Sequence, residues 1–214
     1  MSSPKRPCFA VDIDNVLGRA EQEVQRLFQE LTGTPWPMGL YGSPGGLDSR
    51  HIDRSLIEEI FTRFHEESIP RLPLLPAAKY ALGVIHRTYR IIIVTARRPS
   101  SRPQTLQWLA DHGIPFDGLY HTEEKADIPE SMSVAIDDHP HHIQGYRDLG
   151  VRVFVMDQPW NRKILSSGVT RVTGWDAVLQ WFHVGQISFG LRRGAESPSP
   201  QHLLKNLLLP VTPP

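Results

Sequence analysis

The sequence has a single cysteine, Cys8, among its 214 residues. No disulfide can form within one chain, so we expect a protein of the reducing cytoplasm, with Cys8 as a small buried hydrophobic residue. Long hydrophobic runs are also lacking, because uncharged apolar stretches such as residues 91–94 are far too short to span a bilayer. Asp12 and Asp14 interrupt the apolar residues near the N-terminus, and we therefore expect neither a signal peptide nor a membrane partner.

An excess of charge of either sign is missing as well. Lysine and arginine number 23, aspartate and glutamate number 23, and the formal net charge is +0. Without a basic field or stripe, the chain is not expected to bind nucleic acid or an anionic membrane surface, whereas small charged substrates remain open. A hydrophobic share of 40% is typical of a globular protein, and this length suffices for one core with a small appended module.

Short apolar runs alternate with helical patterns along the chain. The first run, residues 9–11, is predicted to be a buried strand. Further strands are predicted at residues 90–94, 133–136 and 151–155, with a weaker one at 118–120. Helical patterns lie between them, and two of these end at Gly113 and Gly150. The alternation predicts an α/β fold with a doubly wound, Rossmann-like parallel sheet.

The interval between the first and second predicted strands is too long for one crossover helix. It holds two amphipathic segments, separated by a glycine- and proline-rich loop at residues 33–46. We therefore expect a small helical cap, residues 18–74, inserted over the end of the first strand. The core would comprise residues 1–17 and 75–190. Residues 191–214 would form a mobile tail, whose leucines could dock a partner or a second copy in a homodimer.

Asp12 and Asp14 stand at the carboxyl end of the first predicted strand. Strand side chains alternate between faces, so both carboxylates point to the same side. Adjacent buried carboxylates repel each other and are costly to desolvate, so a cation is expected beside them. Asp137 and Asp138 end a later strand, and the carboxyl ends of parallel strands meet at one edge of the sheet. Oxygen ligands of this kind suit a magnesium ion.

Two further groups at the same edge suit a phosphate. Thr95 ends the second strand, and Lys125 follows the third. A hydroxyl and an ammonium at this edge would bind phosphoryl oxygens and neutralise the charge that develops during phosphoryl transfer. The strand ends therefore predict a site for phosphoryl transfer.

In combination, four segments resemble the motifs of the haloacid dehalogenase superfamily. They are Asp-Ile-Asp-Asn-Val at 12–16, Ile-Val-Thr-Ala-Arg at 93–97, Lys125, and Ile-Asp-Asp at 136–138. The resemblance spans residue 8 to about residue 155. Residues 95–99, 157–161 and 171–175 look closest to the 5'(3')-deoxyribonucleotidase branch and related bacterial nucleotidases. Proteins of that branch carry a small helical cap after the first motif, in agreement with the insertion expected above.

The resemblance implies a hydrolase of phosphomonoesters. Asp12 would be the nucleophile that forms an aspartyl-phosphate, and Asp14 would be the general acid and then the general base. The groups implied to bind the substrate phosphate are Thr95, Ala96, Arg97 and Lys125. The implied magnesium ligands are Asp12, Asp14 through its backbone carbonyl, Asp137 and Asp138. Which of the last two makes the inner-sphere bond is left open.

The expected substrate is a (deoxy)nucleoside monophosphate. A sugar phosphate or another small phosphomonoester is an alternative, and so is a nucleic-acid end, although the neutral net charge disfavours the latter. A dehalogenase is disfavoured because dehalogenation needs neither Asp14 nor the metal. A non-catalytic scaffold is the remaining alternative. The sequence leaves the base and the sugar open.

Several nearby residues could belong to the site. The superfamily commonly has glycine where this chain has Asn15, and asparagine tolerates the left-handed backbone better than most residues. Trp36, in the insertion, could stack on a base. His139, His141 and His142 are expected to form a loop and a helix start without a metal, because magnesium prefers oxygen ligands.

Overall fold

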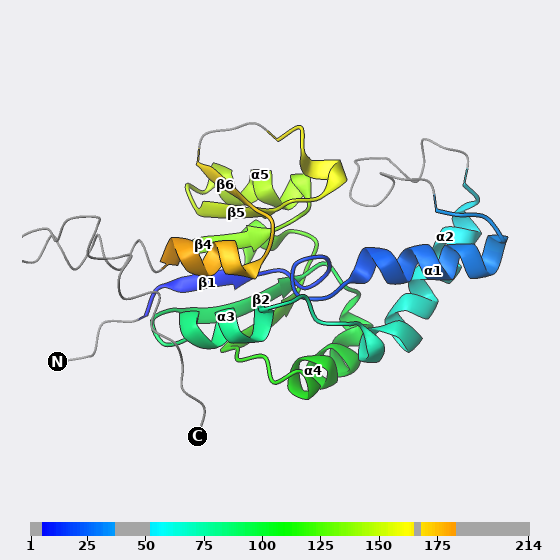
Figure 1. The fold of residues 1–214 in the computed structure, drawn as a ribbon, viewed down its shortest axis with the longest axis horizontal. Coiled ribbons are helices and arrows are strands. Elements are labelled where there is room, and N and C mark those ends of the chain that lie inside the picture. Colours follow the sequence, from blue (N-terminus) through cyan, green and yellow to red (C-terminus); the bar gives the residue numbers. More distant parts are fainter. Residues whose placement is uncertain (1–5, 37–51, 165–167, 183–214) are drawn as a thin grey trace, which may run out of the picture. The chain divides into compact units, whose positions relative to one another are not determined.

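A six-stranded parallel sheet forms the centre of the fold. The computed structural model describes residues 6–36, 52–164 and 168–182. The strand order is β3-β2-β1-β4-β5-β6, and each neighbouring pair is parallel (Figure 1). The strands are β1 (Cys8–Val11), β2 (Arg90–Thr95), β3 (Gly118–His121), β4 (Met132–Asp137), β5 (Arg152–Met156) and β6 (Val169–Val172). The predicted fold class is therefore confirmed.

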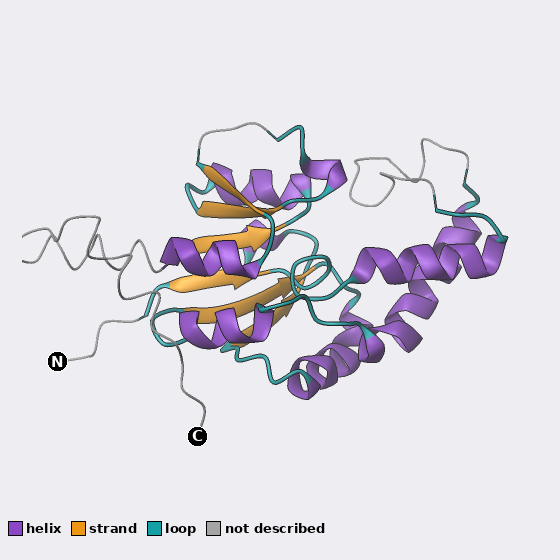
Figure 2. Ribbon diagram, in the orientation of Figure 1, coloured by secondary structure: helices purple, strands orange, loops and turns teal. Residues whose placement is uncertain are grey.

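Helices cover both faces of this sheet (Figure 2). The chain steps from β1 to β2 and β3 in one direction and from β4 to β5 and β6 in the other. Because parallel crossovers are right-handed, α3 (Ala78–Ile85) and α5 (Pro140–Asp148) lie on opposite faces. The central strands are thus buried on both sides, which explains their continuous apolar sequences. The strand order reverses between β1 and β4, and ligands bind at such a reversal.

The insertion after β1 is helical, as predicted. It contains α1 (Ala20–Thr32), α2 (Arg54–Arg63) and a π-helical turn at Phe64–Ser68, and α1 leaves the edge of the sheet where β1 ends (Figure 1). The limits of the cap at residues 18 and 74 stay a prediction. The chain divides into two compact units, Met1–Leu179 and Gln180–Pro214. The expected tail at residues 191–214 lies outside the described residues.

The loop after β1 is held by the backbone and by a distant tryptophan. The carbonyl oxygen of Ile13 accepts from the amides of Leu17 at 2.7 Å and Gly18 at 2.9 Å. Asn15 adopts the left-handed conformation, with φ 61°, as expected for the residue that replaces glycine. The indole of Trp175 donates to the carbonyl oxygen of Val16 at 2.7 Å. These bonds fix the backbone that carries Asp12 and Asp14.

Across the described part of the chain, the helices are too short or too polar for a membrane span.

Candidate active site

Three buried carboxylates gather at the carboxyl end of the sheet. Asp12 follows β1, Asp137 is the last residue of β4, and Asp138 comes next. One oxygen from each carboxylate lies within 4.8 Å of the other two. The three residues are 5%, 0% and 3% exposed in the same order. Neighbouring parallel strands end side by side, so residues 125 positions apart in the sequence share one buried cluster.

Lys125 provides the positive charge inside this acidic cluster. It begins a short 3-10 turn, Lys125–Asp127, and its ammonium Nζ donates to Asp12 Oδ1 at 2.6 Å and to Asp137 Oδ2 at 2.8 Å. One ammonium between three carboxylates leaves a buried excess of negative charge, which is costly. A divalent cation would remove that excess, and carboxylate oxygens are ligands of the kind that magnesium prefers. The residues present therefore fit the predicted metal.

The buried charges shift the pKa values of all three carboxylates. Burial, helped by the neighbouring Asp137 and Asp14, raises the pKa of Asp12 to about 7. Burial also raises the pKa of Asp138 well above its usual range, with Asp12 and Asp137 adding to the rise. At Asp137, burial acts in the same direction but is outweighed by Lys125 and His142, so its pKa is lowered. Two of the three carboxylates thus have raised pKa values, in keeping with the buried excess of negative charge.

Magnesium should therefore stabilise the protein more at pH 8 than at pH 5.5. The folded-state pKa of Asp12 lies near 7, above its ordinary value of 3.8, so between these values the folded state holds the extra proton. The contribution of Asp12 to the free energy of unfolding consequently falls as the pH rises through 7. Metal binding needs the ionised carboxylate and reverses this loss. Thermal unfolding with and without Mg²⁺ at both pH values measures the difference, and an equal shift at both would contradict the assignment.

Arg97 binds the carboxylate of Asp14. Its Nη2 donates to Asp14 Oδ1 at 2.7 Å, and its Nε donates to Oδ2 at 2.9 Å. The buried guanidinium lies 5.9 Å from the ring centre of Phe64, in the insertion, and 5.8 Å from that of Trp108, in α4 (Arg102–Asp111). Such a bidentate pair, flanked by aromatic rings, fixes the orientation of the carboxylate. The phosphate contact expected of Arg97 stays a prediction.

Two asparagines hold the segments around Asp138. Asn15 Nδ2 donates to Asp138 Oδ2 at 3.3 Å, and Asn15 Oδ1 accepts from the amide of Glu21 at 2.7 Å. Asn161, which sequence reasoning gave no role, is 0% exposed, and its Nδ2 donates to the carbonyl oxygens of Asp138 and Met156 at 2.8 Å each. It forms a capping box with Gln158. That local pattern was the signal from which Asn161 could have been recognised.

Thr95 and the histidines lie around the same edge of the sheet. Thr95 is the last residue of β2, is fully buried, and its Oγ1 accepts from the amide of Arg97 at 3.2 Å. Ala96 follows it and is half-buried. The amide of His139 donates to Asp137 Oδ1 at 2.9 Å, and His142 Nδ1 lies 3.5 Å from the same oxygen. The histidines thus occupy the expected loop and helix start. The phosphate-binding roles of Thr95 and Ala96 stay predictions.

Trp36 is separate from the carboxylate cluster. It follows α1, whose 13 residues extend about 20 Å. Its ring packs edge to face on Phe28, with 5.0 Å between the ring centres, and Trp36 is 7% exposed. Trp36 therefore packs against α1 in the helical insertion. Its stacking on a base stays a prediction.

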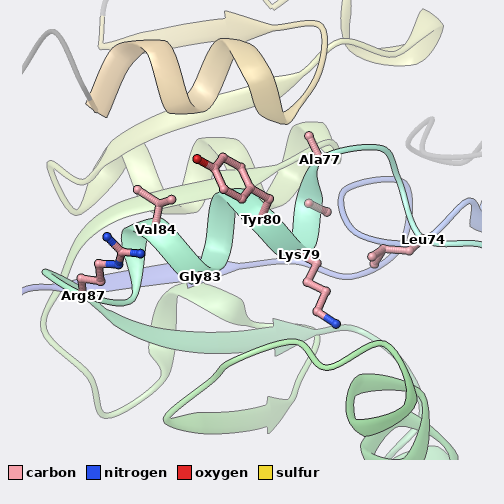
Figure 3. Close-up of a pocket in the computed structure, with 8 residues that line it drawn as sticks. Leu74, Ala77, Lys79, Tyr80, Gly83, Val84 and Arg87 are labelled. Atoms are coloured by element: carbon pink, nitrogen blue, oxygen red, sulfur yellow. The ribbon is translucent and has the colours of Figure 1, made fainter. Parts of the chain in front are cut away.

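A hollow along α3 offers different chemistry. It has a volume of about 540 Å³ and is lined by Leu74, Ala77, Ala78, Lys79, Tyr80, Gly83, Val84 and Arg87 (Figure 3). Its ionisable groups are two bases and a tyrosine, without a carboxylate. Such a lining has neither a metal ligand nor a nucleophilic acid. We therefore place the candidate active site at the carboxylate cluster.

Curated relatives of the chain are named as nucleotidases. No family model matches the sequence. The chain is 27% identical over 152 residues to "Putative 5'(3')-deoxyribonucleotidase" of Chlorobaculum tepidum, over 67% of this chain and 69% of that protein. It is 23% identical over 111 residues to "Putative nucleotidase YqfW" of Bacillus subtilis, over 50% of this chain and 58% of that protein. The match thus spans little more than half the length of YqfW.

Solved structures share the fold at low sequence identity. A haloacid dehalogenase-like family hydrolase of Streptococcus pneumoniae has a TM-score of 0.65 at 16% identity, covering 83% of this chain and 98% of that one. The "putative HAD-hydrolase YfnB" of Bacillus subtilis, solved with bound magnesium, has a TM-score of 0.56 at 14% identity, covering 84% of this chain and 100% of that one. CbbY of Rhodobacter sphaeroides, solved with phosphate, has a TM-score of 0.57 at 16% identity, covering 79% and 95%. The chain therefore has the fold of the haloacid dehalogenase-like hydrolases.

Proposed function

We propose that the chain is a magnesium-dependent phosphomonoester hydrolase that acts on (deoxy)nucleoside monophosphates through an aspartyl-phosphate. The observation that carries the proposal is the buried cluster of Asp12, Asp137 and Asp138 around Lys125. It combines a nucleophilic carboxylate, an ammonium and a donor set for a hard cation. The names of the curated relatives support the substrate class.

In the proposed reaction, Asp12 forms and then loses a bond to phosphorus, and Asp14 donates one proton and later takes one back. A carboxylate oxygen of Asp12 attacks phosphorus, and the ester oxygen leaves as an alcohol after it takes a proton from Asp14. Water then attacks the phosphorus of the aspartyl-phosphate and gives its proton to Asp14, which releases phosphate and restores Asp12. Lys125 counteracts the rise in the pKa of Asp12 and, with the Thr95 hydroxyl, binds the phosphoryl oxygens. Magnesium would be held by Asp12, Asp137, Asp138 and the Asp14 carbonyl oxygen. It would neutralise negative charge on the phosphoryl oxygens.

Phosphate release from a substrate panel tests this proposal. The panel contains nucleoside and deoxynucleoside monophosphates, ribose 5-phosphate and other sugar phosphates, each with Mg²⁺ and with a chelator. We expect turnover of nucleoside monophosphates that is lost with the chelator and restored by Mg²⁺. If the protein hydrolysed a sugar phosphate faster than any nucleoside monophosphate, the proposed substrate class would be wrong. Absence of release from every compound would favour a non-catalytic scaffold.

Arg97→Met should lower the rate of hydrolysis by an amount that depends on whether the leaving group needs a proton from Asp14. The guanidinium holds both Asp14 oxygens, and general acid catalysis contributes about 10² to 10⁴ in rate when the leaving alcohol needs a proton. We expect a loss of about 10²-fold with a nucleoside monophosphate and a much smaller loss with 4-nitrophenyl phosphate, whose phenolate leaves without protonation. Arg87→Met, an exposed arginine of the α3 hollow, is the matched control. Equal losses with both substrates would show that Arg97 does not act through Asp14.

A further inference from the structure

A second, polar cleft adjoins the carboxylate cluster. It has a volume of about 280 Å³ and lies between the start of α1, the loop after β1 and the turn after β5. The residues that matter below are Asn15, Arg19, Glu21, Gln25, Gln158 and Trp160. Unlike the hollow along α3, this cleft combines a carboxylate, a guanidinium, several amides and an indole. Such a mixture suits a small ligand with both a polar edge and a flat face.

Glu21 brings an unsatisfied acceptor to the cleft. Its Oε1 accepts from Gln25 Nε2 at 2.9 Å, whereas its Oε2 is buried and has no hydrogen-bond partner in the described part of the chain. A buried acceptor without a donor is costly, so a ligand N–H or O–H would relieve the cost. The Arg19 guanidinium also makes no side-chain hydrogen bond or ion pair within the described segments, which leaves it available as a donor.

Asn15 connects this cleft to the proposed metal ligands. Asn15 lines the cleft, and its side-chain Nδ2 donates to Asp138 Oδ2 at 3.3 Å. On the cleft side, Gln158 Nε2 donates to the Asn15 carbonyl oxygen at 3.4 Å. Asn15 also directly follows Asp14, the proposed proton donor to the leaving group. Asn15 therefore joins the cleft to the carboxylate cluster through a single side chain.

We propose that the cleft binds the nucleoside part of a nucleoside monophosphate whose phosphate lies at Asp12, an inference that rests on the proposed function. Glu21 accepts a hydrogen bond from an amino or imino N–H of the base, and Arg19 donates to a base carbonyl or ring nitrogen. The Trp160 indole lines the same cleft, and aromatic side chains of this kind pack against bases. Base selectivity is thus set at the start of the insertion and in the turn after β5, through Arg19, Glu21 and Trp160, rather than by Trp36.

Kinetics of Glu21→Gln and Arg19→Met test the proposal. We expect the KM for nucleoside monophosphates to rise about tenfold, with a clearly smaller rise for ribose 5-phosphate, which has the sugar and phosphate without the base. Gln29→Ala is the matched control, because Gln29 lies exposed on the same helix and does not line the cleft. An equal rise in KM for the nucleotides and for ribose 5-phosphate, or no rise in KM for the nucleotides, would overturn the proposal.

Direct binding of nucleosides separates this proposal from the proposed function. Adenosine and cytidine carry no phosphate, so their binding does not depend on hydrolysis. We expect each to shift the indole N–H NMR signal of Trp160, assigned with Trp160→Phe, and to do so more weakly in Glu21→Gln. Such shifts in a protein that releases no phosphate would support the cleft while the proposed function fails. Absence of any shift at millimolar nucleoside would overturn the cleft assignment, whatever the enzyme hydrolyses.

Discussion

Replacing Asp12 by asparagine is expected to lower phosphate release by at least about 10⁴-fold, because the amide cannot form the aspartyl-phosphate. The fold should survive. Asparagine has nearly the same shape, and the backbone around residue 12 is held by the sheet, with the Asp12 amide bonded to the Ile136 carbonyl oxygen at 3.1 Å. Initial rates of phosphate release measure the loss, and circular dichroism with thermal unfolding measures the fold.

A second substitution in the same cluster serves as the comparison for Asp12→Asn. Asp138→Asn also removes one carboxylate from the cluster but leaves the proposed nucleophile in place. We expect this variant to regain activity as the Mg²⁺ concentration is raised, whereas Asp12→Asn should not regain it. If Asp12→Asn kept more than a few per cent of wild-type turnover, Asp12 would not be the nucleophile.

Replacing Lys125 by methionine is expected to cost about 3 to 5 kcal/mol in the free energy of unfolding, the usual cost of breaking a buried ion pair. The Lys125 side chain is 2% exposed and its ammonium contacts both Asp12 and Asp137, so its removal leaves these carboxylates buried without a cation. Phosphate release should be lost as well. Denaturant unfolding without metal measures the stability, and Mg²⁺ should restore more stability to this variant than it adds to the wild type.

Lys163→Met provides the matched control for Lys125→Met. Lys163 is an exposed lysine that follows β5, and a methionine there is expected to change the free energy of unfolding by less than about 0.5 kcal/mol. If Lys125→Met were as stable as this control, the acidic cluster would not need the ammonium. The charge balance that motivates the metal would then be wrong.

The sequence was sufficient to locate the acidic cluster because the information is local. Apolar runs mark the strands, and the acids stand directly at their ends, so the parallel topology alone brings Asp12, Asp137 and Asp138 to one edge. β6 was not predicted, since Val169–Val172 contains a threonine and an arginine and is too short for a clear pattern. In α4, Trp108 and Leu109 are buried, whereas Leu106 is 38% exposed.

Contacts between distant segments were beyond sequence reasoning. Arg97 binds Asp14 across 83 positions, and its aromatic neighbours Phe64 and Trp108 come from two further segments. No spacing rule connects these residues, because the contact exists only once the insertion has folded against α4. The arrangement gives Asp14 a partner that the motifs alone did not indicate.

Trapping the covalent intermediate tests the central claim most directly. The protein is mixed with a ³²P-labelled nucleoside monophosphate and Mg²⁺, quenched in acid within milliseconds, digested and mapped by mass spectrometry. We predict label on the peptide that contains Asp12, absent from Asp12→Asn and lost on longer incubation as phosphate appears. Release of phosphate from the wild type without label at Asp12, or with label on another residue, would contradict the assignment of this cluster as a phosphoryl-transfer site with Asp12 as its nucleophile.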